Sequence, residues 1–200
     1  MMKFFQDKWM LFSCLEKSLR RGCPDLSSKY ASVLYDIDEN FLYYKLSNFC
    51  LDEIGLANIS LIKKFLSTQC KKNNIDSLGG KEFIKQYVIE CANSVKDRSV
   101  SDLNYLAIAS GIKIEKNNER IFLNKEYSLT ERFIAGWNLL SAQKLINPLI
   151  DRSESFKKLD FVLNVLEIDS DVVDICRDAY IVHREPNFIG LMLLSKLFEK

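Results

Sequence analysis

Apolar residues recur every three or four positions over most of the chain, which is the spacing of one buried face of an α-helix. The first such segment runs from about residue 4 to residue 21, and Gly22 follows it in the position of a helix C-terminal stop. We expect its buried stripe to consist of Phe5, Trp9, Phe12, Leu15 and Leu19.

Three further helices are expected before residue 70, and each has a start or stop signal. Pro24 and Asp25 open the first of them. Asp38 is placed as the N-cap of the second, which Gly55 ends, and Asn58 caps the third. The residues expected to face inward are Tyr30, Val33, Leu34, Phe41, Leu42, Leu46, Phe49, Ile59, Ile62, Phe65 and Leu66.

The helical spacing of apolar residues continues after the loop at 77–80 and is interrupted at residue 112. One helix is expected to end near Val95, and another runs to Ala109. Between 112 and 123 apolar residues alternate around a polar turn, which predicts a small β-hairpin, with an irregular loop as the alternative. Helical spacing then returns at 130–146, 156–166, 172–182 and 188–198.

The pattern therefore predicts an all-α multi-helix bundle of about nine or ten helices, with one small β-hairpin insertion near 112–123 or a loop in its place. We expect a helical domain at 1–110, the hairpin or loop at 111–127, and a C-terminal helical region at 128–200 that packs on the first.

Composition narrows the class of protein. Apolar residues make up 48% of the 200 residues and aromatic residues 12%, which excludes the disordered and fibrous classes. The longest apolar stretches fall short of the roughly 20 residues that a membrane span needs. An acidic residue at Asp7 and the lack of an apolar run before it argue against a signal peptide, so we expect a cytoplasmic protein without membrane contact.

Metal and cofactor sites are not expected. The six cysteines are widely spaced without a C-x-x-C pair, and His183 is the only histidine. A structural zinc site needs about four clustered ligands, so the cysteines are interpreted as small buried apolar residues. Catalysis by His183 with Cys176 is not expected either, because the two residues lie two helical turns apart.

The charge balance of 28 basic against 27 acidic residues gives a net charge of +1, which does not support nucleic-acid binding by bulk charge. A local basic face is still conceivable in two places. Lys17, Arg20 and Arg21 lie in the last turn of a helix, where cations also simply favour the helix dipole. Lys63 and Lys64 lie on a later helix, where a solvated face is the alternative to a DNA contact.

Two other sets of residues have a structural interpretation beside a functional one. Asp52 and Glu53 are adjacent, so on a helix they point in different directions. A structural role, either capping or pairing with the Arg20–Arg21 end, is favoured over metal binding or acid–base catalysis. Trp9 and Trp137 are expected in the core, whereas an exposed aromatic patch would indicate a protein interface.

Three ordered segments give the chain a resemblance to a known family. They are KSLRRGCPD at 17–25, LDEIGLA at 51–57, and ANSVKDRS at 92–99, which ends a helix opened by Gly79-Gly80. This order resembles the C-terminal helical, collar region of clamp-loader-class AAA+ ATPases, in particular the replication-associated recombination ATPases (MgsA/RarA). The residues that fit the pattern best are Lys17, Ser18, Arg20, Gly22, Pro24, Asp25, Gly55, Leu56, Ala57 and Lys96.

One departure from the family pattern concerns the ATPase motor, and two lie in the collar segments themselves. The chain has no G-x-x-x-x-G-K-[S/T] phosphate loop, Arg21 is an additional residue before Gly22, and Asp52-Glu53 reverses the family's acidic order. The family's ATP hydrolysis is therefore not carried over, and no cofactor is expected.

The resemblance implies a non-catalytic DNA replication or repair accessory module. It would act by oligomerisation and contact with a protein partner, with weak DNA backbone binding by Lys17, Arg20, Arg21, Lys63 and Lys64. The alternative is a helical adaptor or inhibitor of phage or mobile-element origin that binds a host replication factor.

Overall fold

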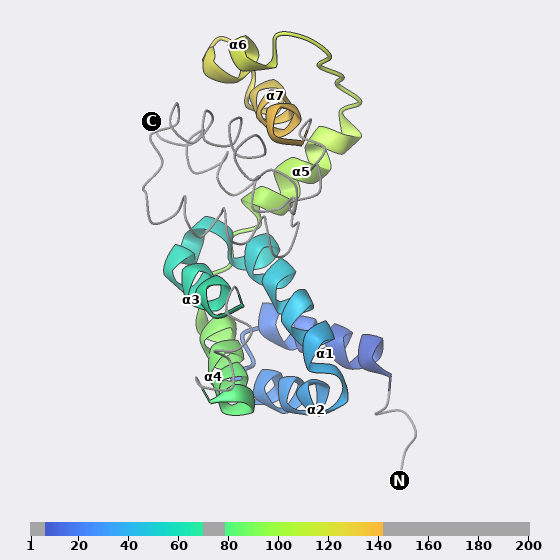
Figure 1. Ribbon diagram of the computed structural model, residues 1–200, viewed down its shortest axis with the longest axis vertical. Coiled ribbons are helices and arrows are strands. Elements are labelled where there is room, and N and C mark those ends of the chain that lie inside the picture. Colours follow the sequence, from blue (N-terminus) through green and yellow to red (C-terminus); the bar gives the residue numbers. More distant parts are fainter. Residues whose placement is uncertain (1–6, 70–78, 142–200) are drawn as a thin grey trace, which may run out of the picture. The chain divides into compact units, whose positions relative to one another are not determined.

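The computed structural model describes residues 7–69 and 79–141, and the chain divides into two compact units, 1–98 and 99–200 (Figure 1). The described residues form helices and no strand, which confirms the all-α class. Helix α5 falls in the second unit, whereas the sequence grouped it with the first. The helices predicted at 156–166, 172–182 and 188–198 lie outside the described residues, as do Cys176 and His183.

Residues 7–69 and 79–98 of the first unit form four α-helices and two short helical turns. Helices α1 and α4 both pack against α2, which makes α2 the central element. In chain order the elements are α1 (Lys8–Arg20), α2 (Pro24–Phe49), the π-helical turn η2 (Cys50–Ile54), the 3₁₀ turn η3 (Gly55–Asn58), α3 (Ile59–Gln69) and α4 (Gly80–Asn93).

The predicted helix boundaries follow from local chemistry. Gly22 adopts φ +65° directly after α1, and the backbone N–H of Cys23 donates to the carbonyl of Ser18. Asp38 has extended backbone angles inside α2, and its carboxylate accepts from the N–H of Phe41, so the helix restarts there in a new direction. Asn58 accepts from the N–H of Leu61 at the start of α3. These three signals are confirmed.

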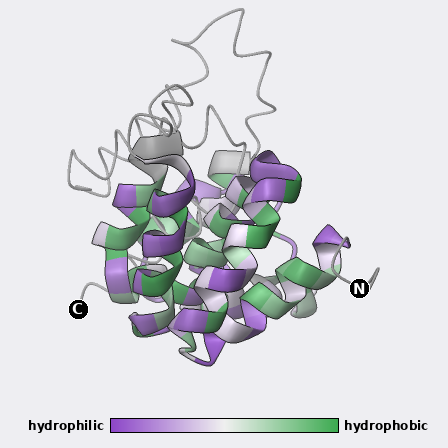
Figure 2. Ribbon diagram, turned by 90° about the horizontal axis from the view of Figure 1, so that it is seen from below, coloured by the Kyte–Doolittle hydropathy of each residue, from purple (hydrophilic) through white to green (hydrophobic). Residues whose placement is uncertain are grey.

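The core of the first unit is aliphatic with two aromatic rings at its centre. Phe65 of α3 stacks on Tyr87 of α4 with ring centroids 4.5 Å apart, and both side chains are fully buried. Each helix of the unit carries hydrophobic and hydrophilic residues along its length (Figure 2). The fully buried leucines around the rings include Leu11, Leu15, Leu19, Leu34, Leu42 and Leu46.

Two inward-facing assignments are wrong. Trp9 is 59% exposed and Val33 is 39% exposed. Leu11 takes the interior position in the first turn of α1, so the buried stripe of that helix is rotated away from Trp9. Periodicity alone does not distinguish these two registers near a helix end, because the stripe has too few turns there.

The second unit contains α5 (Ser99–Ala109), α6 (Asn118–Leu123) and α7 (Leu129–Ser141). The hairpin predicted near 112–123 is wrong, because α6 occupies its second half. Phe122 is buried, and its carbonyl accepts a hydrogen bond from Arg132 of α7. These tertiary contacts favour a helical turn over an isolated two-stranded hairpin, which is marginal in water. Ser128 and Glu131 form a capping box at the start of α7.

An apolar hollow of about 140 Å³ lies within the second unit, lined by residues of α5, α7 and the segment after α5. Among residues 7–69 and 79–141, no helix has the length and apolar character that a membrane crossing requires.

A junction of three sequence motifs as the candidate functional site

The three segments that carry the family resemblance meet in the first unit. We call residues 17–25, 52–57 and 96–98 the motif junction. The backbone N–H of Asp97 donates to the carbonyl of Glu53 at 2.8 Å, which joins the second segment to the third. The guanidinium of Arg20 lies 2.7 Å from the Glu53 carboxylate, which joins the first segment to the second.

Glu53 is the charged centre of the motif junction. Its side chain is only 4% exposed, and the Nε of Arg98 lies 3.7 Å from the same oxygen that Arg20 contacts. Arg20 also binds Glu16 one helical turn earlier, at 2.9 Å. A buried carboxylate is tolerated only with such partners, because an unpaired charge loses its hydration. Glu53 therefore pairs with the Arg20 end of α1, as the sequence predicts.

Asp52 lies next to this ion pair and titrates differently from an ordinary aspartate. Burial raises the pKa of Asp52 to about 6, and the negative charge of Glu53 adds to the effect. Arg98 and Arg20 oppose the shift, while Glu16 adds to it. The two adjacent acids therefore differ in surroundings: Glu53 is held by arginines, whereas Asp52 carries a desolvation cost when it is charged.

Two glycines allow the segments to approach each other closely. Gly55 has φ +49°, and a Cβ built there would lie 2.7 Å from the carbonyl oxygen of Asp97. Gly22 also has a positive φ, and its Cβ would lie 3.4 Å from the carbonyl oxygen of Ala92. A side chain at Gly55 is thus excluded by both backbone conformation and space.

The remaining polar residues of the motif junction bind backbone carbonyls or lie where they stabilise the start of a helix. The hydroxyl of Ser18 donates to the carbonyl of Leu15 and lies 2.8 Å from the hydroxyl of Ser27. Pro24 is the first residue of α2 and Asp25 lies in its first turn, where both are favoured at a helix start. The ammonium of Lys96 donates to the carbonyls of Cys91, Ala92 and Ser94 at the end of α4. Leu56 is half-buried in η3.

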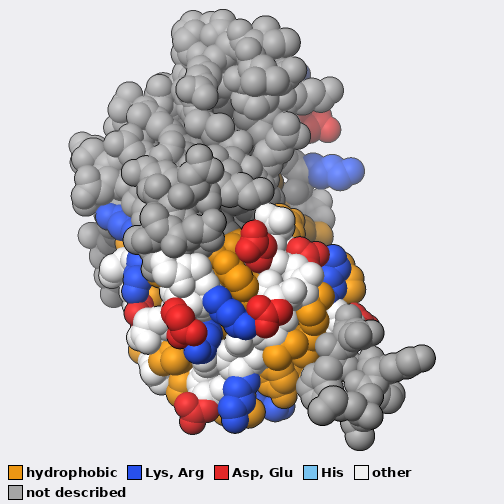
Figure 3. Space-filling view, turned by 60° about the horizontal axis from the view of Figure 1, so that its bottom comes forward, with side chains coloured by type: hydrophobic (Ala, Val, Ile, Leu, Met, Phe, Trp, Pro, Cys, Tyr) orange, Lys and Arg blue, Asp and Glu red, His pale blue; other side chains and the backbone are white. Residues whose placement is uncertain are grey.

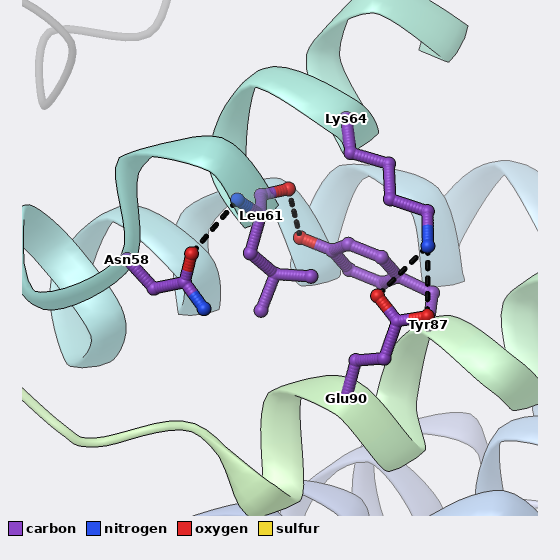
Figure 4. A network of polar contacts seen from close by, with 5 residues as sticks. All are labelled: Asn58, Leu61, Lys64, Tyr87 and Glu90. Carbon is purple, nitrogen blue, oxygen red and sulfur yellow. Dashed lines mark hydrogen bonds and ion pairs between the residues drawn. The ribbon is translucent and has the colours of Figure 1, made fainter.

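The five candidate DNA-binding residues divide into two groups. Arg20 is bound to Glu16 and Glu53, and Lys64 of α3 is bound to Glu90 of α4 by two hydrogen bonds (Figure 4). No ion pair within residues 7–69 and 79–141 involves the other three, Lys17, Arg21 and Lys63. Charged side chains of both signs are interspersed with hydrophobic ones in the described part of the face shown in Figure 3.

A cluster that the sequence did not predict lies on the first unit, where α1 meets the second half of α2. Trp9 packs edge-on against Phe41 at 4.9 Å, and Phe12 packs against the same ring at 5.9 Å. The ammonium of Lys45 lies 4.9 Å from the centre of the Trp9 ring and 5.5 Å from that of Tyr44. We call these residues, Trp9, Phe12, Phe41, Tyr44 and Lys45, the aromatic surface.

Two of the five side chains of the aromatic surface are exposed to solvent, and the other three are half-buried. Trp9 is 59% exposed and Tyr44 is 47% exposed. Lys8 borders it, lying 4.9 Å from the Phe41 ring and 2.7 Å from Asp38 at the kink of α2. The i, i+3 spacing of Trp9 and Phe12, and of Phe41 and Tyr44, is the signal that would have found it. The aromatic surface was missed from the sequence because aromatic residues at helical spacing were assigned to the core.

The contacts described at the motif junction hold its segments together. Within the part of the chain that the structure describes, no three potential metal ligands come together. Comparison of the chain with protein-family models, with curated proteins and with solved structures gives no match. Two features of the first unit therefore remain from which a function can be inferred. They are the motif junction and the aromatic surface.

Proposed function

We propose that the chain is a non-catalytic accessory module of DNA replication or repair, which acts by binding a protein partner and by self-association. The observation that carries this proposal is the aromatic surface. Trp and Tyr are residue types that dominate binding energy at protein interfaces, and here the exposed Trp9 and Tyr44 lie on either side of Lys45.

The motif junction supports the same proposal because its polar residues form structural contacts within the first unit. Arg20 and Glu53 hold the first two segments together, the backbone of Asp97 joins the third segment to Glu53, and Lys96 binds the carbonyls at the end of α4. A frame of this kind fixes the orientation of α1 and α2, and these two helices carry the aromatic surface. The link to replication or repair rests on the resemblance of these same segments to the collar region of clamp-loader-class ATPases.

The self-association part is tested by light scattering of the full chain during size-exclusion chromatography, over a range of concentrations. A single defined oligomer that dissociates in the Trp9→Ala/Tyr44→Ala variant supports it. Tyr105→Ala is the matched control, because Tyr105 is a 75% exposed aromatic residue of the second unit. A wild-type chain that stays monomeric at all concentrations contradicts this part.

The partner is tested in cells that naturally produce the protein, by chemical cross-linking followed by mass spectrometry. We expect clamp-loader, clamp or repair proteins to be cross-linked to the wild type and to the Tyr105→Ala control, and to be lost with Trp9→Ala/Tyr44→Ala. Recovery of only unrelated proteins, or equal recovery with all variants, contradicts the proposal.

A further inference from the structure

Two buried thiols in the first unit lie in direct contact. Cys50 is the first residue of η2, and Cys91 lies in the last turn of α4. Their sulfur atoms are 3.8 Å apart, and the side chains are 1% and 0% exposed. A disulfide has a sulfur–sulfur distance of about 2.05 Å, so the two sulfurs need to approach by somewhat less than 2 Å.

The two thiols lie in a small network of buried polar contacts. The hydroxyl of Tyr87 donates to the carbonyl of Leu61, which is the contact drawn in Figure 4. The Cys50 sulfur lies 2.8 Å from the same hydroxyl. The Cys50 sulfur thus contacts both the Tyr87 hydroxyl and the Cys91 sulfur, and in each of these contacts either group can be the donor.

We propose that Cys50 and Cys91 form an intramolecular disulfide on oxidation, as a modification site that links the end of α2 to α4. With a peroxide as oxidant, the two thiols and one hydrogen peroxide give one disulfide and two water molecules. One thiol loses its proton and attacks a peroxide oxygen as the thiolate, which forms a sulfenic acid and breaks the O–O bond; the departing hydroxide takes up that proton as the first water. The second thiol then displaces the sulfenic hydroxyl as the second water.

The surroundings make oxidation of this pair slow. Burial raises the pKa of the Cys91 thiol, so the thiol form dominates at neutral pH. Reaction therefore requires local opening of the unit, after which reclosing returns the two sulfurs to contact. The link would act on the motif junction, because the Cys91 carbonyl accepts from Lys96 and Cys50 opens the turn that contains Glu53.

The test is oxidation of the folded full chain with hydrogen peroxide, followed by alkylation of the remaining thiols and tryptic digestion without reductant. Cleavage after Lys45, Lys63, Lys85 and Lys96 places Cys50 in peptide 46–63 and Cys91 in peptide 86–96. We expect these two peptides joined by one disulfide. The melting temperature should rise by roughly 5–15 °C and return to its starting value with dithiothreitol.

The controls separate this site from general oxidation. Cys14→Ser and Cys23→Ser replace two half-buried cysteines of the same unit and should retain both the linked peptide and the thermal shift. Cys91→Ser and Cys50→Ala should lose both. If both thiols of the wild type are recovered alkylated, as sulfinic acids, or linked to other cysteines, the proposal is overturned, whatever the variants do.

Discussion

The guanidinium of Arg20 at the end of α1 lies 2.7 Å from the carboxylate of Glu53, whose side chain is 4% exposed in the turn after α2. Arg98 contributes a second cation at 3.7 Å. This relationship joins two segments that lie more than thirty residues apart in the sequence. It explains how the Glu53 carboxylate can be buried in a small helical unit.

Arg20→Ala should therefore destabilise the first unit. The change leaves a buried carboxylate with Arg98 as its remaining partner, and we expect the free energy of unfolding to fall by about 1–2 kcal/mol in urea denaturation. Lys85→Ala is the control, because its partner Glu82 is 75% exposed and such a pair contributes about 0–1 kcal/mol. Equal losses in the two variants would show that Glu53 does not depend on Arg20.

Asp52→Asn should stabilise the protein at neutral pH and not in acid. Because the pKa of Asp52 is raised to about 6, the folded state holds more protons than the unfolded state between about pH 4 and pH 6. The contribution of Asp52 to the free energy of unfolding therefore falls as the pH rises through that interval. We expect the variant to exceed the wild type by about 1 kcal/mol at pH 7.5, after allowance for solvent screening.

The measurement for Asp52 is the free energy of unfolding at several pH values, and the gain should vanish below about pH 4. Glu115→Gln is the control, since Glu115 is an exposed acid of the second unit and its loss should produce no such pH-dependent gain. A gain that persists unchanged at low pH would mean that packing, and not titration, causes it.

Gly55→Ala should cost more than Gly22→Ala, although both glycines have a positive φ. At Gly22 the added Cβ meets a carbonyl at 3.4 Å, so the cost is mainly the backbone strain of about 1–2 kcal/mol. At Gly55 the Cβ would lie 2.7 Å from the Asp97 carbonyl, so the segments must separate. We expect a loss of about 3 kcal/mol or more, measured by thermal or urea unfolding. Similar costs at both positions would contradict a close approach at Gly55.

If the chain contacts DNA, the cations without an ion pair among the described residues should carry the contact. The variant Lys17→Ala/Arg21→Ala/Lys63→Ala should weaken binding to duplex DNA in fluorescence anisotropy and lower its salt dependence by about 0.9 log units per lost phosphate contact. Lys64→Ala is the control, because Lys64 is engaged by Glu90. A wild type without salt-sensitive binding at low ionic strength would exclude the DNA contact.

The local signals of the sequence were the most dependable guide to the fold. Asp38, Asn58 and Gly22 each act through their own side chain or backbone conformation on residues within one helical turn, and each was found where expected. The prediction for residues 112–123 was wrong because the structure there depends on contacts with residues further along the chain. Its alternating pattern fits a hairpin, but the burial of Phe122 and the hydrogen bond from Arg132 belong to a helix.

The sequence by itself determined the helical class, most helix boundaries of the first unit and the order of the three motif segments, because these depend on neighbours along the chain. The tertiary structure decided which polar residues meet. It brought Arg98 to Glu53, left Trp9 in solvent beside Lys45, and placed Cys50 against Cys91. Such contacts depend on how α1, α2 and α4 pack, and residues far apart in sequence carry no local signal of that packing.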